Sequence, residues 1–165
     1  LADIARERAK LLEEKKAMNI AFDKALTDDE RNRIKSQLAS IDKRLDSIAY
    51  RESHSKAGWL YVISSPSLPN LTKIGCTRRL VPMVRVKELS SSSLPEPFHA
   101  HCFVFSDDCF ELESQMHEYF DKERVNPDRE FFRIEPKEAI DVLRDIFNVD
   151  VHFVDEDCDE NEEDE

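Results

Sequence analysis

The sequence predicts a small α+β domain that is preceded by a helical arm and followed by an acidic tail. Apolar residues repeat with helical spacing in the first fifty residues, whereas short β-rich runs alternate with amphipathic segments after residue 58. The chain has 165 residues, of which 40% are hydrophobic and 36% are charged, so a core covers only part of it. The predicted boundaries are residues 1–56 for the arm, 57–148 for the domain and 149–165 for a disordered tail.

The arm is expected to contain two helices. Thr27 and Glu30 have the spacing of a capping box, which predicts that a helix begins there. Behind it, apolar residues recur at intervals of four and three, at Ile34, Leu38, Ile41, Leu45 and Ile48. A looser stripe precedes this seam, at Ile4, Leu11, Leu12, Met18 and Phe22. Neither stripe is sufficient alone, so we expect a helical hairpin or coiled coil that pairs within the chain, with the domain, or with a second copy in a homo-oligomer.

The domain is expected to begin with a β-hairpin. Residues 59–63 form an apolar, β-rich run that ends at a Ser-Ser-Pro sequence, and residues 71–75 are the expected return strand. Pro82 favours the first turn of a short helix carrying Arg85 and Leu89, because its fixed φ suits that position. Residues 90–97 are rich in Ser and Pro and are expected to form a loop.

The second half of the domain repeats the alternation of strand and helix. Residues 98–105 predict a third strand, which places on one face His99, His101, Phe103 and Phe105, and on the other Phe98, Ala100, Cys102 and Val104. Asp108 with Glu111 predicts a helix that runs to about Lys122, and residues 131–134 predict a last short strand. Pro136 then begins a helix along Ile140, Leu143, Ile146 and Phe147. The predicted order of elements is ββαβαβα, and the predicted fold class is a three-stranded sheet, mixed or antiparallel, flanked by helices.

The charge of the chain is unevenly distributed. The formal net charge is −12, but residues 150–165 carry ten acids and no Lys or Arg. Residues 53–87 contain no Asp or Glu and carry six positive charges, on Lys56, Lys73, Arg78, Arg79, Arg85 and Lys87. This local basic face suits a phosphate partner. For the tail, three interpretations stand side by side: a solvating terminus, a DNA mimic that covers the basic face, and a segment that recruits a partner.

Several classes of protein are excluded by the composition. No apolar run approaches the roughly 20 residues of a membrane span, and the charged start is not a signal peptide, so we expect an intracellular, cytoplasmic protein without a membrane partner. A chain that begins at Leu1 is expected to be a fragment or a processed product. The cysteines at 76, 102, 109 and 158 lack metal-binding spacing and are expected to be reduced. Two glycines are too few for a Gly-rich phosphate loop.

Several ordered blocks in the second half of the chain resemble one family. They are Tyr61 in the first strand, residues 73–79 (KIGCTRR), residues 85–90 (RVKELS), residues 113–117 (ESQMH) and residues 129–132 (REFF). In this order the chain resembles the GIY-YIG nuclease superfamily, and within it the bacteriophage T-five Orf-172 DNA-binding branch. Lys73 stands where the superfamily has the Tyr of YIG, and Trp59 stands at the place of the first Gly.

The resemblance implies a metal-dependent DNA endonuclease. Phosphodiester hydrolysis needs an activated water, a cation against the phosphate and a metal at the reacting oxygens. By family position Glu113 is the ligand of one Mg²⁺ or Mn²⁺, Arg85 clamps the scissile phosphate, and Tyr61 is the general base or orients the water. His117 follows Glu113 by one helical turn and is expected to protonate the leaving oxygen or to position the ligand.

Other residues are expected to support this site. Lys73 is expected to lie beside Tyr61 and to lower the pKa of its phenol. Glu130 is expected to pair with Arg85 or Arg79 across the site. The predicted DNA-binding residues are Arg78, Arg79, Lys87, His101 and Glu130.

Two other functions compete with the nuclease. The first is a non-catalytic DNA-binding module of the same fold, whose arm mediates oligomerisation or docking on a larger assembly. The second is a structural protein in which the arm is the functional part. Loss of turnover in Glu113→Ala separates the enzyme from both, and a silent Arg85→Ala is expected only if the arm alone matters.

Overall fold

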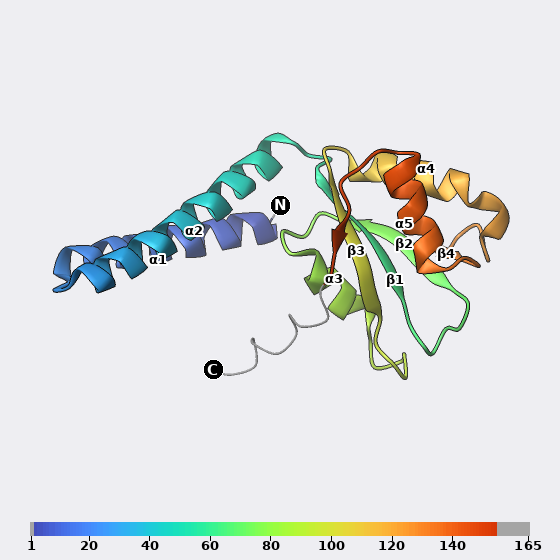
Figure 1. The fold of residues 1–165 in the computed structure, drawn as a ribbon, viewed down its shortest axis with the longest axis horizontal. Helices are drawn as coiled ribbons and strands as arrows, with labels where there is room; N and C mark the ends of the chain where they lie inside the picture. Colours follow the sequence, from blue (N-terminus) through green and yellow to red (C-terminus); the bar gives the residue numbers. More distant parts are fainter. Residues whose placement is uncertain (1, 155–165) are drawn as a thin grey trace. The chain divides into compact units, whose positions relative to one another are not determined.

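The computed structural model describes residues 2–154, drawn as a ribbon in Figure 1. The chain divides into two compact units, the first ending at Ser55 and the second beginning at Lys56. The first unit is the predicted arm and the second contains the predicted α+β domain.

The arm is a hairpin of two helices, α1 (Ala2–Lys24) and α2 (Asp28–Ser53). Thr27 begins α2 as expected, because its hydroxyl accepts a hydrogen bond from the backbone N–H of Glu30 at 3.2 Å. The carboxylate of Glu30 accepts from the N–H of Leu26 at 3.1 Å. The capping box is therefore displaced by one residue from its usual reciprocal form.

The predicted seam closes between the two helices of the same chain. Ile41 and Ile48 of α2 are buried, and α1 contributes apolar residues at intervals of seven: Ile4, Leu11, Met18 and, just beyond the helix, Ala25. Leu12 was expected in this stripe, but it is 49% exposed because it lies one residue, about 100°, away from the line of Ile4 and Leu11.

Ion pairs along the edges of the hairpin set its antiparallel register. Arg44 pairs with Glu7 at 2.6 Å, Lys15 with Asp42 at 2.6 Å, and Arg8 with Glu52 at 3.0 Å. These side chains are largely exposed, so the pairs contribute little to stability and serve mainly to align the helices.

The second unit is built on a five-stranded sheet in which every pairing is antiparallel. Its order is β4-β2-β1-β3-β5. The three expected strands are its centre: β1 (Gly58–Ser64), β2 (Thr72–Thr77) and β3 (His99–Ser106). The sheet has more strands than the three expected: β4 (Phe131–Phe132) is the short strand predicted at residues 131–134, and β5 (His152–Phe153) was not predicted. Such short strands carry no readable alternation.

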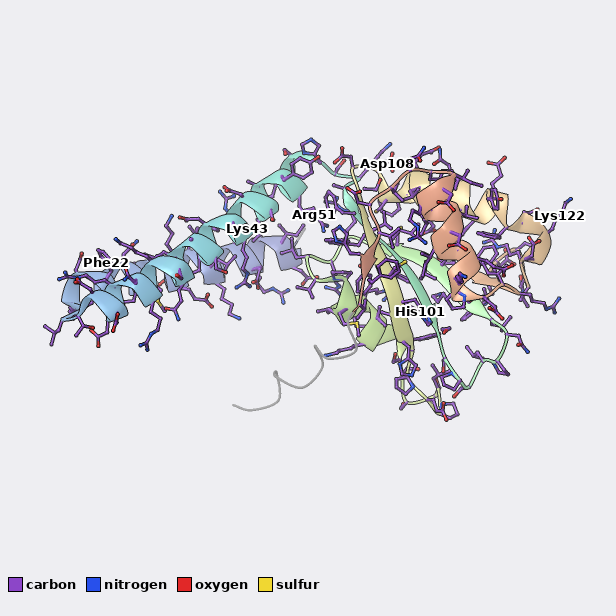
Figure 2. The ribbon with its side chains drawn as sticks, viewed as in Figure 1. Phe22, Lys43, Arg51, His101, Asp108 and Lys122 are labelled. Carbon is purple, nitrogen blue, oxygen red and sulfur yellow. The ribbon has the colours of Figure 1, made fainter. Side chains whose placement is uncertain are left out.

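Helices cover both faces of this sheet. They are α3 (Pro82–Leu89), α4 (Cys109–Tyr119) and α5 (Pro136–Asp145), with a 3₁₀ turn at Asp121–Glu123. The Asp108 carboxylate accepts from the N–H of Glu111 at 3.0 Å and begins α4 as predicted (Figure 2). The helix ends at Tyr119 and not near Lys122, because the chain tightens into the 3₁₀ turn.

Two apolar clusters form on opposite faces of the sheet. The larger joins strand residues to α4 and α5, with Leu60, Ile74, Met116, Phe132 and Leu143 among its buried members. The smaller lies on the face that α3 covers (Figure 1) and contains Tyr61, Ile63, Val86, Phe98 and Phe103. The predicted catalytic tyrosine therefore belongs to the α3 face.

A bulge in β3 changes the predicted assignment of its faces. The register between β1 and β3 shifts at Val62 and Ile63. As a result Phe98 and Ala100 join Phe103 on the α3 face, whereas strict alternation put them on the opposite face. Cys102 and Val104 remain together in the larger cluster. The extra residue in the bulge is the physical reason for the difference.

The domain extends past the predicted boundary at residue 149. Val149 and Val151 pack against the larger cluster, Val154 packs against the smaller one, and β5 pairs with β3 between them. The expectation of a disordered tail is therefore wrong for residues 149–154, in which Val149, Val151 and Val154 gain burial. The acidic residues 155–165, for which disorder was also predicted, lie outside the described part of the chain.

Two further expectations concern the chain as a whole. Cys76, Cys102 and Cys109 are free thiols, and Cys158 lies outside the described residues. Within residues 2–154, every helix is too short or too polar to cross a bilayer.

Candidate functional site

The site is built around a change of partner along β2. β4 pairs only with Thr72 and Lys73, so the sheet edge opens after these residues. At Ile74 the N–H donates to the Glu130 carbonyl at 3.1 Å, while the carbonyl accepts from Nε2 of His117 at 2.8 Å. His117 of α4 thus donates the hydrogen bond that a neighbouring strand would otherwise supply. Beyond Ile74, β4 no longer pairs with β2.

Tyr61 lies over this edge on the α3 face. It is paired with Gly75 across β1 and β2 and is only 2% exposed. A Cβ on Gly75 would collide with the phenol oxygen and Cζ of Tyr61 and would lie 2.8 Å from Oε2 of Glu130. Gly75 is therefore required by close approach, and its bare backbone brings the Tyr61 hydroxyl and the Glu130 carboxylate over one point.

The Tyr61 hydroxyl makes no hydrogen bond within residues 2–154, yet it does not count among the fully buried polar atoms that lack a partner. The ring is packed in the smaller cluster, so little of the residue is exposed. This arrangement suits a hydroxyl that binds water or a phosphate oxygen.

Lys73 and Glu130 form an ion pair beside the tyrosine. Nζ of Lys73 lies 3.0 Å from Oε2 of Glu130 and 4.9 Å from the centre of the Phe131 ring. The Lys73 side chain is only 13% exposed, which limits its freedom. The expected pairing of Glu130 with Arg85 or Arg79 is wrong, because the short strand β4 brings Glu130 next to β2 and not next to α3.

The expectation that Lys73 lowers the pKa of Tyr61 is also wrong. Burial raises this pKa well above the usual range, and the carboxylate of Glu130 raises it further. The cation whose field opposes these effects is Arg85, since Lys73 is already committed to Glu130. Tyr61 is therefore a neutral phenol at neutral pH.

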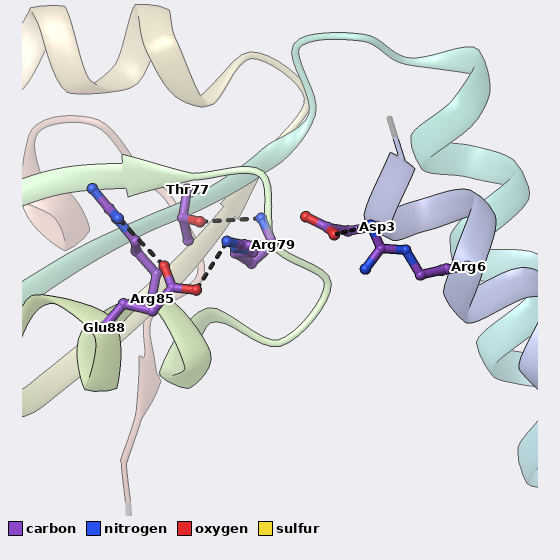
Figure 3. Close-up of polar contacts among 6 residues, drawn as sticks. All are labelled: Asp3, Arg6, Thr77, Arg79, Arg85 and Glu88. Carbon is purple, nitrogen blue, oxygen red and sulfur yellow. Dashed lines mark hydrogen bonds and ion pairs between the residues drawn. The ribbon is translucent and has the colours of Figure 1, made fainter.

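Arg85 approaches the site from α3 and shares a carboxylate with Arg79. Glu88 lies 3.3 Å from Nη1 of Arg85 and 2.9 Å from Nη2 of Arg79 (Figure 3). The N–H of Arg79 also donates to the Thr77 hydroxyl at 3.1 Å. Glu88 was not predicted as a site residue, although it follows Arg85 by three residues on a helix, which is the spacing of an ion pair. Figure 3 also draws Arg6 and Asp3, an ion pair at 3.9 Å within α1.

Glu113 reaches the same region from α4. It is half-buried, and its charge acts on the Cys76 thiol and on Tyr61. The neighbouring Cys109 and Glu113, together with burial, raise the pKa of Cys76 far above the usual range. Tyr61, Arg85 and Glu113 thus come together from β1, α3 and α4, although 52 residues of sequence separate the first from the last.

The other predicted residues fall into two groups. Arg78 and Lys87 are neighbours in sequence of Arg79 and Arg85. Arg78 donates from Nε to the Ala57 carbonyl at 3.2 Å, and Lys87 is exposed on α3. His101, labelled in Figure 2, lies in the β3 bulge, where its Nε2 is 2.6 Å from the Ser64 hydroxyl. Burial, followed by the nearby His99, lowers the pKa of His101. It belongs to the far end of β1, away from Glu113.

The donor set limits how a metal ion can bind. Among residues 2–154, no group of three or more His, Cys, Asp or Glu side chains is arranged to hold a metal. Glu113 supplies a single carboxylate, and Mg²⁺ commonly binds one such carboxylate together with waters and phosphate oxygens. The described residues therefore do not form an all-protein metal cage.

Most of the second unit matches a known domain family. The model of the T5orf172 domain matches residues 58–147, which is more than half of the chain. Comparison with curated proteins and with solved structures returns no match. The matched region contains Tyr61, Lys73, Arg85, Glu113, His117 and Glu130. Its family is associated with nuclease-like and DNA-binding proteins. The chain therefore belongs to the T5orf172 domain family.

Proposed function

We propose that this protein is a metal-dependent DNA endonuclease with a GIY-YIG-type site. The observation that carries the proposal is the convergence of Tyr61, Arg85 and Glu113 at the open edge of β2. Phosphodiester hydrolysis requires a group that holds water, a cation that binds phosphate and an anion that binds a metal, and these three side chains are of those types.

Arg85 is the residue proposed to bind the scissile phosphate. Its side chain is 43% exposed and its ion pair with Glu88 is easily exchanged at this exposure. A phosphate can accept both forks of the guanidinium, which gives charge neutralisation and orientation together. Arg79, Arg78 and Lys87 extend the cationic surface and are proposed to hold the flanking backbone of the DNA.

Glu113 is proposed to hold one Mg²⁺ or Mn²⁺. When bound, such an ion polarises the phosphate and stabilises the leaving oxygen. The chain's own contribution is to present the carboxylate from a packed helix. His117 anchors that helix to the Ile74 carbonyl one turn further on, which makes its role the positioning of Glu113.

Tyr61 is proposed to orient the attacking water. Its raised pKa keeps the phenol protonated, so the neutral hydroxyl can donate to or accept from a bound water without itself removing the proton. Gly75 allows the tyrosine to pack directly on the backbone of β2 in this position.

The experiment that tests the proposal is cleavage of supercoiled plasmid, linear duplex and single-stranded DNA with Mg²⁺, Mn²⁺ or EDTA. Wild type is compared with Glu113→Ala and with Glu118→Ala, a matched change at an exposed position of the same helix. Metal-dependent cleavage in wild type and Glu118→Ala, with loss of turnover and retained DNA binding in Glu113→Ala, supports the enzyme. Cleavage that is equal in all three proteins contradicts the role of Glu113.

A second candidate is a non-catalytic DNA-binding module. The observation that favours it is that, within residues 2–154, no group of three or more His, Cys, Asp or Glu side chains is arranged to hold a metal around Glu113. In that case all three proteins bind DNA in a salt-sensitive manner and none of them cleaves any substrate. The arm is then proposed to provide oligomerisation or docking.

A further inference from the structure

The proposed site contains a second carboxylate, that of Glu130, beside Tyr61. Glu130 lies next to the Tyr61 hydroxyl because Gly75 has no side chain between them. Resting on the proposed endonuclease function, we propose that Glu130 is the general base of the reaction, that Tyr61 holds the attacking water against it, and that Lys73 is the positioning residue for Glu130.

The oxygens of Tyr61 and Glu130 lie close together over Gly75. A Cβ at Gly75 would lie 2.8 Å from Oε2 of Glu130 and would collide with Oη of Tyr61, so the tyrosine itself fills the space above this backbone. The attacking water is placed on the solvent side of the two oxygens, where it can donate one hydrogen bond to Glu130 and share a second with Tyr61. The Tyr61 hydroxyl has no competing partner within residues 2–154, so it is available for that water.

Lys73 holds the carboxylate in this place. Its Nζ binds the same Oε2 atom at 3.0 Å, and its stem is fixed by the Phe131 ring and by 87% burial of the side chain. The Glu130 backbone is fixed as well, since its carbonyl accepts from the N–H of Ile74 at 3.1 Å. The Glu130 side chain remains 36% exposed, which leaves a route by which a proton returns to solvent.

The step balances with water as the only co-reactant. The O–H bond of the water breaks and its proton passes to Glu130, while the water oxygen forms a bond to phosphorus. The phosphorus–oxygen ester bond breaks, and its electron pair leaves with the oxygen of the departing strand, which takes a proton from solvent. Glu130 then releases its proton to solvent. Tyr61 remains a neutral phenol throughout, so the reaction does not require a phenolate.

The charged and titratable groups around this pair all belong to the site. The groups that act on Tyr61 are Glu130, Arg85, Glu113 and Cys76, and the cation in contact with Glu130 is Lys73. A pH dependence of cleavage that is removed by substitution of Glu130 alone reports on that carboxylate.

The test compares kcat and KM for DNA cleavage across pH 5–9 in wild type, Glu130→Gln and Glu96→Gln, an exposed glutamate of the loop before β3. We expect kcat of Glu130→Gln to fall by about 10²–10⁴-fold with little change in KM, and the remaining rate to rise with pH because hydroxide replaces the base. Glu96→Gln keeps the wild-type profile. A wild-type pH profile in Glu130→Gln overturns the assignment while leaving the endonuclease intact.

Two further measurements separate the parts of the proposal. Lys73→Met is expected to lower kcat at unchanged KM and to be rescued in part by Lys73→Arg. A higher KM at unchanged kcat identifies Lys73 as a phosphate-binding residue and overturns its positioning role.

NMR of ¹³Cζ-labelled tyrosine tests the contact between Tyr61 and Glu130 without turnover. Glu130→Gln is expected to lower the pKa of Tyr61 and to shift its resonance in the folded protein, and an unchanged titration overturns the contact. Failure of wild type to cleave any DNA overturns the proposed function and the base with it.

Discussion

Nε2 of His117 donates a hydrogen bond to the carbonyl oxygen of Ile74 across 2.8 Å, and this contact joins α4 to the strand that carries Gly75. The carbonyl belongs to the edge of β2 where β4 has ended, so it would otherwise lose its partner. The ring of His117 also packs 5.1 Å from that of Phe132. A predicted catalytic histidine is thereby engaged in holding the sheet edge and the helix of Glu113 together.

Replacement of His117 is therefore expected to affect stability as well as activity. His117→Ala leaves the Ile74 carbonyl without its donor, and we expect the free energy of unfolding to fall by about 1–3 kcal/mol. Urea unfolding measures the change, with Glu118→Ala as the control on the next residue. His117→Asn, whose amide can donate, is expected to recover part of the loss. Wild-type stability in His117→Ala contradicts this structural role.

Gly75→Ala tests the close approach of Tyr61 and Glu130. The added Cβ collides with both side chains, so they must move, and we expect a loss of about 1–3 kcal/mol in the free energy of unfolding. The fluorescence or NMR signal of Tyr61 is expected to change in the folded protein. If neither the stability nor the Tyr61 signal changes, the space above the Gly75 backbone is larger than these contacts indicate.

Removal of the Glu88 charge is expected to strengthen DNA binding. Glu88 competes with phosphate for Arg79 and Arg85, and Glu88→Gln removes the charge of this competitor from both ion pairs. Because the side chains are partly exposed, we expect an increase in affinity of up to about fivefold at low salt. Titration of labelled duplex at several salt concentrations measures it, and the salt dependence is expected to become steeper. Glu118→Gln controls for the change in net charge; an equal gain there would attribute the effect to net charge alone.

Stability is expected to decrease in alkaline solution. Burial raises the pKa of Cys102 to about 12, whereas an unfolded cysteine ionises near pH 8.5. The folded chain therefore holds the proton more tightly, so this contribution is complete below about pH 8.5 and is lost as the pH rises toward the folded value. The slope approaches about 1.4 kcal/mol per pH unit for this group.

The alkaline loss is measured by urea unfolding between pH 7 and pH 10. Tyr61 and Cys76 act in the same direction, since both have a raised pKa. Cys102→Ala is expected to show a shallower slope than wild type. Equal slopes in the two proteins would show that Cys102 is not the source.

The cap of α2 allows a test that is confined to the arm. Thr27→Ala removes the hydroxyl that accepts from Glu30, and we expect a loss of about 1 kcal/mol in the stability of the hairpin. Thr27→Ser retains the acceptor and is the matched control. Helical circular dichroism during thermal unfolding reports the change; a Thr27→Ala curve that overlays the Thr27→Ser curve would mean that the cap adds nothing.

Local chemistry along the chain was enough to predict most of the elements. Thr27 and Asp108 are found at the starts of α2 and α4, Pro82 and Pro136 at the starts of α3 and α5, and the three central strands lie within one or two residues of their predicted ends. These signals depend on side-chain hydrogen bonds and on fixed φ angles within a few residues, and so they can be read without the fold. The ordered blocks also carried the resemblance to the Orf-172 branch, which the T5orf172 match supports.

The partners of the charged side chains were decided only by the tertiary structure. Charge alone did not show whether Glu130 pairs with Lys73 or with an arginine; the two-residue pairing of β4 with β2 settles it in favour of Lys73. The pKa of Tyr61 was likewise predicted with the wrong sign, because its burial against the α3 face outweighs a nearby cation. Ion pairs and desolvation depend on distances between segments far apart in sequence, and those distances exist only after the sheet and its helices have packed.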